Sequence, residues 1–135
     1  MKLSHKFFLI LLLAVSLFFV SCNGKVKEQY GGTWIMVRSN TDGKNEGMNY
    51  ALSQGLAIEL QLDTENKKIR VVTQVGTNEA EELNNGKLSL MDGYYRSWLP
   101  NRDTGTAAWA DIKIKDDGYL HYSTGYDVDW LFEKR

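Results

Sequence analysis

The side chains that most often perform catalysis are sparse in this chain and are not grouped at catalytic spacings. Only one histidine, His121, lies beyond the first 21 residues, and we expect it on the exposed face of a strand. Glu81-Glu82 would point to opposite faces of a strand, and Asp116-Asp117 lie in a predicted turn, so neither forms a general acid–base pair. A lone histidine without clustered carboxylates does not make a metal site. We therefore expect no enzyme, no metal and no cofactor.

The only cysteine, Cys22, follows an apolar stretch near the N-terminus. Lys2 and Lys6 precede an apolar run over residues 7–20, which is interrupted only by Ser16. As a helix this run would be about 21 Å long, shorter than the ~30 Å hydrocarbon core of a bilayer. The pattern is typical of an export signal and not of a transmembrane anchor.

The sequence Phe19-Val20-Ser21-Cys22 resembles the bacterial lipobox, in which a small residue precedes the cysteine that receives diacylglycerol. The resemblance implies a lipoprotein signal peptide over residues 1–21 and a lipid on Cys22. Residues 22–30 would then be the lipidated N-terminus and a tether. Asn23 replaces the Asp that retains some bacterial lipoproteins at the inner membrane, which favours the outer membrane. Ordinary signal-peptidase cleavage after Cys22 or Gly24 is the alternative.

The charge of the chain excludes one class of partner. Its formal net charge is −1, and the signal peptide contains two of the 16 basic residues and none of the 17 acidic ones. The exported part is therefore slightly more acidic, without the basic surplus that nucleic-acid binding requires. Its partner is expected to be the membrane, through the N-terminal lipid. The sequence does not indicate an oligomeric state.

Short segments of alternating polar and apolar residues, separated by turn residues, fill residues 31–135. This pattern predicts an all-β domain, an up-and-down antiparallel barrel of about eight strands. The connection over residues 42–55 is long, with one helical turn expected over 48–53, and either a lid or a surface excursion fits it. The predicted strands are 33–40, 56–62, 68–75, 77–83, 87–91, 94–99, 107–115, 119–123 and 127–134.

Gly32-Thr33-Trp34 opens the first predicted strand, and this Gly-x-Trp resembles the first-strand motif of lipocalins and related calycin barrels. The resemblance implies that Trp34 closes one end of the barrel and that the last strand returns beside the first. Trp130 and Lys134 share one face of that last strand by alternation. Lys134, or Arg135 if the register slips by one residue, could therefore reach Trp34. Gly32, Trp34, Trp130 and Lys134 would form the closure.

Arg38 is a candidate for contact with a ligand. By alternation it shares a face with Trp34 and Met36, about 13 Å further along the strand than Trp34. A buried arginine needs an anionic partner, either a ligand group or a protein carboxylate. The alternative is that Arg38 reaches the rim of the barrel and is solvated.

The turn at Asp92-Gly93 leaves two registers open. With a two-residue turn, Leu90 shares a face with Tyr95, and the barrel buries the odd-numbered side chains of the next strand. With a three-residue turn, it buries the even-numbered ones. We favour the second register, because burying Trp98 gains more free energy than burying Ser97. The even-numbered side chains are Tyr94, Arg96 and Trp98.

These features predict a membrane-anchored lipoprotein whose barrel binds a small, partly apolar ligand. The two arginines extend the expected ligands to anionic ones. Two alternatives remain: a surface module that binds a glycan or protein through exposed Trp and Tyr, to which Trp109 would contribute, or a purely structural barrel. The candidate ligand-binding residues are Arg38, Tyr94, Arg96, Trp98 and Tyr122.

Overall fold

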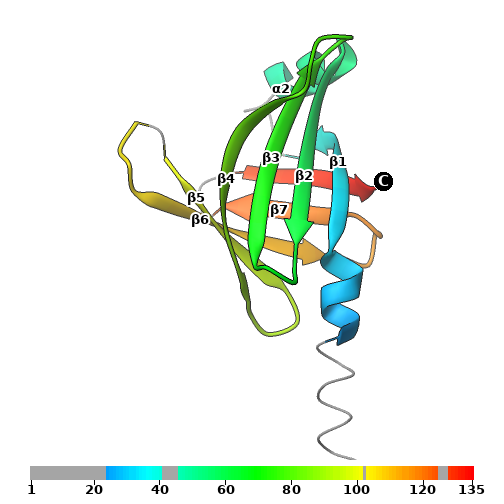
Figure 1. Ribbon diagram of the computed structural model, residues 1–135. Coiled ribbons are helices and arrows are strands. Elements are labelled where there is room, and N and C mark those ends of the chain that lie inside the picture. The colour runs from blue at the N-terminus through cyan, green and yellow to red at the C-terminus, as the bar shows by residue number, and fades with distance from the viewer. Residues whose placement is uncertain (1–23, 41–45, 102, 125–127) are drawn as a thin grey trace, which may run out of the picture.

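The computed structural model describes residues 24–40, 46–101, 103–124 and 128–135, so the predicted signal peptide and Cys22 lie outside the described residues. Eight antiparallel strands follow one another in chain order, and the last pairs with the first to close a barrel (Figure 1). The predicted up-and-down antiparallel barrel is confirmed. The strands are β1 (Gly32–Ser39), β2 (Leu56–Asp63), β3 (Lys68–Val75), β4 (Glu81–Leu90), β5 (Tyr95–Pro100), β6 (Ala107–Ile114), β7 (Leu120–Thr124) and β8 (Val128–Lys134).

One strand, β4, replaces the two that were predicted over residues 77–83 and 87–91. Asn84-Asn85-Gly86, between them, has the composition of a turn but is extended. A Cβ added at Gly86 would overlap the backbone oxygen of Trp98 in β5. Gly86 is therefore the residue that lets β4 run continuously past the neighbouring backbone.

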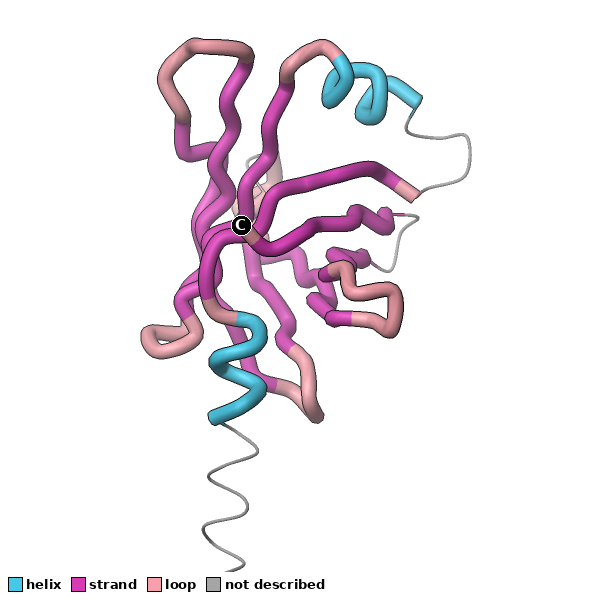
Figure 2. Tube along the Cα trace, turned by 90° about the vertical axis from the view of Figure 1, so that its right-hand side faces the viewer, coloured by secondary structure: helices cyan, strands magenta, loops and turns pink. Residues whose placement is uncertain are grey.

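Two short helices lie at opposite ends of the barrel (Figure 2). Residues 24–30, most of the predicted tether, form a helix that leads directly into β1. The predicted helical turn over 48–53 belongs to α2 (Glu46–Ser53), which contacts β1 and β2. None of the helices in the described ranges is long and apolar enough to cross a membrane.

Helix α2 is fastened to the barrel. The side chain of Asn49 accepts a hydrogen bond from the backbone N–H of Ser39 at 2.7 Å and donates one to its carbonyl at 3.1 Å. Met48 and Leu52 pack against the core. Of the two alternatives for this connection, these contacts favour a lid over a loose surface excursion.

The core fills the barrel with side chains from every strand and from the N-terminal helix. Alternation places them inward, as in β2, where Ile58, Leu60 and Leu62 are buried. The packing extends beyond the predicted boundary at residue 31, because Tyr30 belongs to the core and Val26 packs against it. The core residues are Tyr30, Trp34, Met36, Ile58, Leu60, Leu62, Ile69, Val71, Leu88, Tyr95, Ile112, Leu120 and Phe132.

A β-bulge in β1 overturns the prediction that Arg38 faces the interior. Met36 pairs with Phe132 of β8, but Arg38 pairs with Leu131, so Val37 is an extra residue. The extra residue reverses the alternation, which buries Ser39 and exposes Arg38. The guanidinium carbon of Arg38 lies 5.9 Å from the centre of the Tyr119 ring on the outside of the barrel.

Candidate functional site

The end of the barrel where β1 begins is closed by Trp34, as predicted. Its indole Nε1 donates a hydrogen bond to the carbonyl of Tyr30 at 2.9 Å, and its ring is buried. The Nζ of Lys134 lies 5.6 Å from the centre of that ring, and it donates to the carbonyls of Glu28 and Gln29 at 3.2 and 3.3 Å. The lysine therefore joins the last strand to both the plug and the C-terminal end of the helix.

Gly32 and Tyr30 complete this closed end. The φ of Gly32 is 121°, a conformation that L side chains rarely adopt, which explains the glycine before the plug. The hydroxyl of Tyr30 accepts a hydrogen bond from the backbone N–H of Ile114 at 2.8 Å, and its ring meets Tyr95 edge-on at 5.3 Å. Burial raises the pKa of Tyr30.

Trp130 was predicted to belong to this closure but does not. It lies near the start of β8, at the opposite end of the barrel, and stacks on Tyr122 with ring centres 6.0 Å apart and planes at 28°. Only Lys134, at the other end of the same strand, reaches Trp34. Trp130 and Lys134 do lie on one face of β8, as predicted, but Trp130 lies too far along the strand to reach Trp34.

A cavity of about 350 Å³ lies within the half of the barrel where Trp130 and Tyr122 stack. Its floor is apolar and buried, from Ile58, Leu60 and Val71. Leu83, Pro100 and Asn101, at its rim, are exposed, so the cavity opens between β4 and β5. The ten lining residues are Ile58, Leu60, Val71, Leu83, Asn84, Leu99, Pro100, Asn101, Tyr122 and Trp130.

Among the described residues, the polar groups that line the cavity are few and uncharged. The Nε1 of Trp130 is buried and has no hydrogen-bond partner. Burial raises the pKa of the Tyr122 hydroxyl, although a hydrogen bond with Ser97 opposes the rise. The side-chain amide of Asn84 donates to the carbonyl of Pro100 at 3.0 Å and joins the two strands at the rim. The cavity is therefore lined by the aromatic side chains of Tyr122 and Trp130, and the buried N–H of Trp130 is left unpaired by the described residues.

Of the five predicted ligand-binding residues, only Tyr122 lines this cavity. The hairpin after β4 has the two-residue turn, in which the N–H of Met91 donates to the carbonyl of Tyr94 and Leu90 pairs with Tyr95. The favoured three-residue register was wrong. The comparison of Trp98 with Ser97 left out Tyr95, whose ring fills the core beside Tyr30.

Tyr94, Arg96 and Trp98 consequently lie on the outside, where they meet the outward side chains of β6. Trp98 pairs directly with Trp109, and these two side chains are 36% and 42% exposed. The Arg96 guanidinium lies 4.4 Å from the centre of the Trp109 ring and forms an ion pair with Asp111 at 2.8 Å. This hydrogen bond raises the pKa of Arg96. We call these side chains, with Lys113 over Tyr94, the outer aromatic face.

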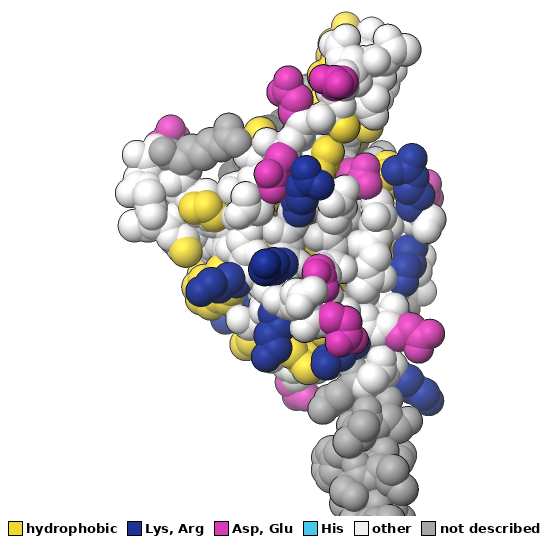
Figure 3. All heavy atoms as spheres, viewed as in Figure 1, with side chains coloured by type: hydrophobic (Ala, Val, Ile, Leu, Met, Phe, Trp, Pro, Cys, Tyr) yellow, Lys and Arg dark blue, Asp and Glu magenta, His cyan; other side chains and the backbone are white. Residues whose placement is uncertain are grey.

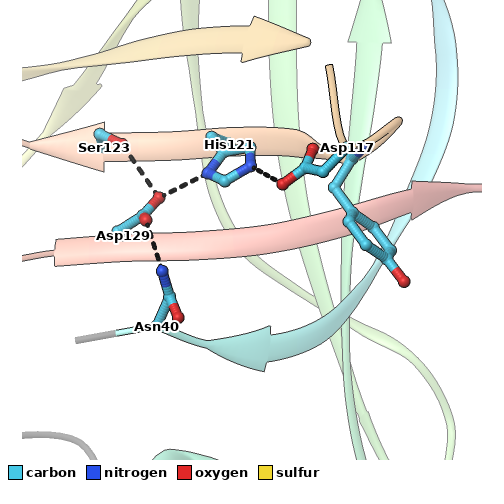
Figure 4. Close-up of polar contacts among 6 residues, drawn as sticks. Asn40, Asp117, His121, Ser123 and Asp129 are labelled. Carbon is cyan, nitrogen blue, oxygen red and sulfur yellow. Dashed lines mark hydrogen bonds and ion pairs between the residues drawn. The ribbon is translucent and has the colours of Figure 1, made fainter. Parts of the chain in front are cut away.

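A buried polar cluster on the outside of the barrel was not predicted (Figure 4). His121, expected to be exposed, is only 5% exposed, and its ring nitrogens contact Asp117 at 2.8 Å and Asp129 at 3.0 Å. Ser123 and Asn40 also donate to Asp129. One feature of the sequence could have predicted this cluster. Ser123 and Asp129 pair on adjacent strands, and this pairing brings His121 beside the same carboxylate.

Both carboxylates of this cluster are held ionised. The hydrogen bond with His121 lowers the pKa of Asp117. Burial alone would raise the pKa of Asp129, but hydrogen bonds from His121, Asn40 and Ser123 outweigh it and lower the pKa. All these contacts are internal, so the cluster fastens the turn before β7 to β8. Across the described ranges no three or more His, Cys, Asp or Glu residues are arranged to hold a metal ion.

A second hollow, of about 740 Å³, lies on the outer face of β1 to β4 near the closed end. Acidic and basic side chains are mixed over the face that these strands turn outward (Figure 3). Arg70 forms an ion pair with Glu82 at 3.2 Å and donates a hydrogen bond to the side-chain oxygen of Gln61 at 3.2 Å. This hollow is larger than the cavity, and the described residues that line it include charged side chains and no aromatic one.

No protein-family model and no curated protein matches the chain. The fold is an eight-stranded, all-antiparallel closed barrel, which is compatible with a lipocalin-like fold.

Proposed function

We propose that this protein is an exported lipoprotein, anchored to the outer membrane through Cys22, whose barrel binds a small, uncharged, partly apolar ligand. The observation that carries the binding proposal is the buried, unpartnered Nε1 of Trp130 beside an open apolar cavity. Leaving a buried donor unpaired costs about 1–3 kcal/mol, which a ligand oxygen would recover. The cavity volume lies at the lower end of the range for ligand sites.

The charge of the ligand follows from the position of the arginines. Arg38 and Arg96 both lie outside the barrel, and none of the described residues that line the cavity is charged. An anion would lose its hydration without gaining a partner there. A neutral molecule with an aromatic or aliphatic body and one hydrogen-bond acceptor suits the site.

Kinship with the lipocalins is part of the proposal. It is supported by the Gly32-Thr33-Trp34 opening, by Lys134 over the Trp34 ring and by a helix between β1 and β2. The lipid anchor is supported by the resemblance of residues 19–22 to the lipobox.

The anchor is tested by metabolic labelling with a palmitate analogue. The wild-type chain should be labelled and the Cys22→Ala variant should not. Equal labelling of the two chains would refute the lipoprotein proposal.

The ligand site is tested with N-phenyl-1-naphthylamine, a neutral apolar probe whose fluorescence rises on leaving water. Wild-type protein should bind it at least tenfold more tightly than Trp130→Leu, whereas Trp109→Ala should bind as the wild type does. The anionic probe 1-anilinonaphthalene-8-sulfonate should bind more weakly. Native mass spectrometry of protein purified from its own cells should also find a co-purified small molecule. No binding by either measurement would indicate a purely structural barrel.

A second candidate function uses the outer aromatic face. Trp98 and Trp109 are exposed side by side, and Trp, Tyr and Arg are the residues that most often dominate binding interfaces. A glycan or a partner protein would bind here. Binding on a glycan array that is lost in Trp109→Ala but kept in Trp130→Leu would favour this function.

A further inference from the structure

The helix over residues 24–30 is fixed to the closed end of the barrel by contacts on several sides. Besides the bonds to Trp34 and Lys134 already described, the Thr64 hydroxyl donates to the carbonyl of Lys27 at 3.1 Å. Tyr30 is buried in the core, and Val26 packs against it. The helix and the barrel therefore form one packed unit, and the direction of the chain at residue 24 is set by the fold.

The proposed lipid anchor lies close to this unit. Only Asn23 separates Cys22 from Gly24, so two residues span at most about 7 Å. The seven-residue helix adds about 10 Å before the barrel begins. A lipid on Cys22 would thus hold the closed end within about 17 Å of the bilayer surface.

Other parts of the chain project in the same direction as the helix. The turns that follow β2 and β4 lie at the helix end of the barrel in both views (Figures 1 and 2). At the second turn Leu90 and Met91 are each 37% exposed, beside the Asp92-Gly93 tip. Among the described residues these are the large exposed apolar side chains at this end.

We propose that the closed end of the barrel docks on the membrane that holds the lipid, with Leu90 and Met91 entering the interfacial layer. This inference rests on the proposed lipid anchor. Lys25 and Lys27 on the helix would lie at the level of the headgroups, and a basic side chain there is attracted to anionic lipids. Asp92 at the tip limits the depth to the interface, because a carboxylate does not enter the hydrocarbon core.

This orientation places the cavity away from the bilayer. Its exposed rim residues Leu83 and Pro100 lie at the start of β4 and the end of β5, the ends of these strands that are distant from the Asp92-Gly93 turn. The ligand would therefore enter from the aqueous side and not from the membrane that carries the protein.

The test uses the acylated full-length protein, reconstituted into vesicles of phosphatidylethanolamine and phosphatidylglycerol. Met91→Cys and Val75→Cys each introduce one free thiol for an NBD fluorophore. Val75 is the matched control, because it is more exposed, at 55%, and lies at the end of β3 that is far from the helix. Urea unfolding of both variants should match the wild type.

The NBD group at position 91 should emit further to the blue and be quenched at least threefold more strongly by a lipid-borne spin label than the group at position 75. Equal quenching, or stronger quenching at position 75, overturns the docked orientation. Palmitate-analogue labelling of the same preparations separates the two proposals. Labelled protein with no difference between positions refutes only this inference, whereas unlabelled protein refutes the anchor and the inference together.

Discussion

Each end of the barrel contains a tryptophan, and the two tryptophans differ in the hydrogen bonding of the indole N–H and in their surroundings. At the closed end the Nε1 of Trp34 donates to the carbonyl of Tyr30, and the ring has Lys134 over it. At the open end Trp130 stacks on Tyr122 and lines the cavity, but its Nε1 has no hydrogen-bond partner among the described residues. One tryptophan is bonded within the fold, and the other borders the cavity that we propose binds a ligand.

The closed end has one unpartnered polar atom of its own, the hydroxyl of Tyr95. Burial raises the pKa of this group, which keeps it neutral. Tyr95 is not among the residues that line the cavity or the outer hollow, whereas Trp130 lines the cavity. The difference between the ends is therefore one of accessible space, and not simply of unpaired donors.

The largest expected effect comes from removing the plug. Trp34→Ala should lower the free energy of unfolding by about 3–5 kcal/mol, because it empties a buried volume and leaves the Tyr30 carbonyl unpaired. Trp130→Ala should cost less, about 1–3 kcal/mol, since its half-buried ring already borders a cavity. Urea unfolding measures both. A larger loss for Trp130→Ala would mean that the open end, and not the closed one, stabilises the fold.

The second-largest effect on stability is expected where the backbone of β4 passes close to that of β5, between the two ends of the barrel. Gly86→Ala should destabilise the protein by about 2–3 kcal/mol, because its Cβ would overlap the Trp98 backbone, which cannot move without disturbing the sheet. Gly47→Ala, in α2, is the control. Its Cβ meets open space and alanine favours helix, so it should be neutral or stabilising. Equal melting temperatures for the two variants would contradict the close approach.

The His121 cluster should give an acid-dependent contribution to stability. The pKa of Asp129 is lowered in the folded protein, so its contribution is complete above its ordinary value near 4 and is lost as the pH falls through the lowered pKa. Asp129→Asn should therefore cost about 1 kcal/mol at pH 7 and much less at pH 2.5. Urea titrations at the two pH values test this. A cost that does not change with pH would show that the ionised form is unimportant.

The smallest effect is expected on the outer aromatic face. Trp109→Ala should change the free energy of unfolding by no more than about 1 kcal/mol, the value of a partly exposed contact with a cation. It should also leave binding of the neutral probe unchanged. A large loss of stability would identify this face as a structural ladder and would remove the surface-binding alternative.

Alternation and turn composition predict the fold of this chain well. In β2 and β3 the predicted and observed strands differ by at most one residue, because each strand has one apolar face and a clear turn after it. The plug and its lysine were also predictable, since antiparallel pairing of the first and last strands brings Trp34 opposite Lys134.

The candidate site was less predictable because single-residue shifts control which side chains enter the barrel. One extra residue, Val37, turns Arg38 outward, and one residue in the turn after β4 turns Arg96 outward. No local pattern marks either shift. The prediction that Trp130 faces the interior was correct. The end of the barrel at which it lies depends on how β8 runs across the barrel.

The pairing of β1 with β8 also determines when the barrel can form. Trp34 and Lys134 are separated by almost the whole length of the barrel sequence, whereas the other strand pairs join immediate neighbours. Contacts of such long sequence separation are slow to form, because the closure of a long loop precedes any gain from packing. Until β8 pairs with it, β1 has an unpaired edge, a state that favours aggregation. Glu133, Lys134 and Arg135 place charges on the last edge to close, where they would discourage pairing between chains during folding.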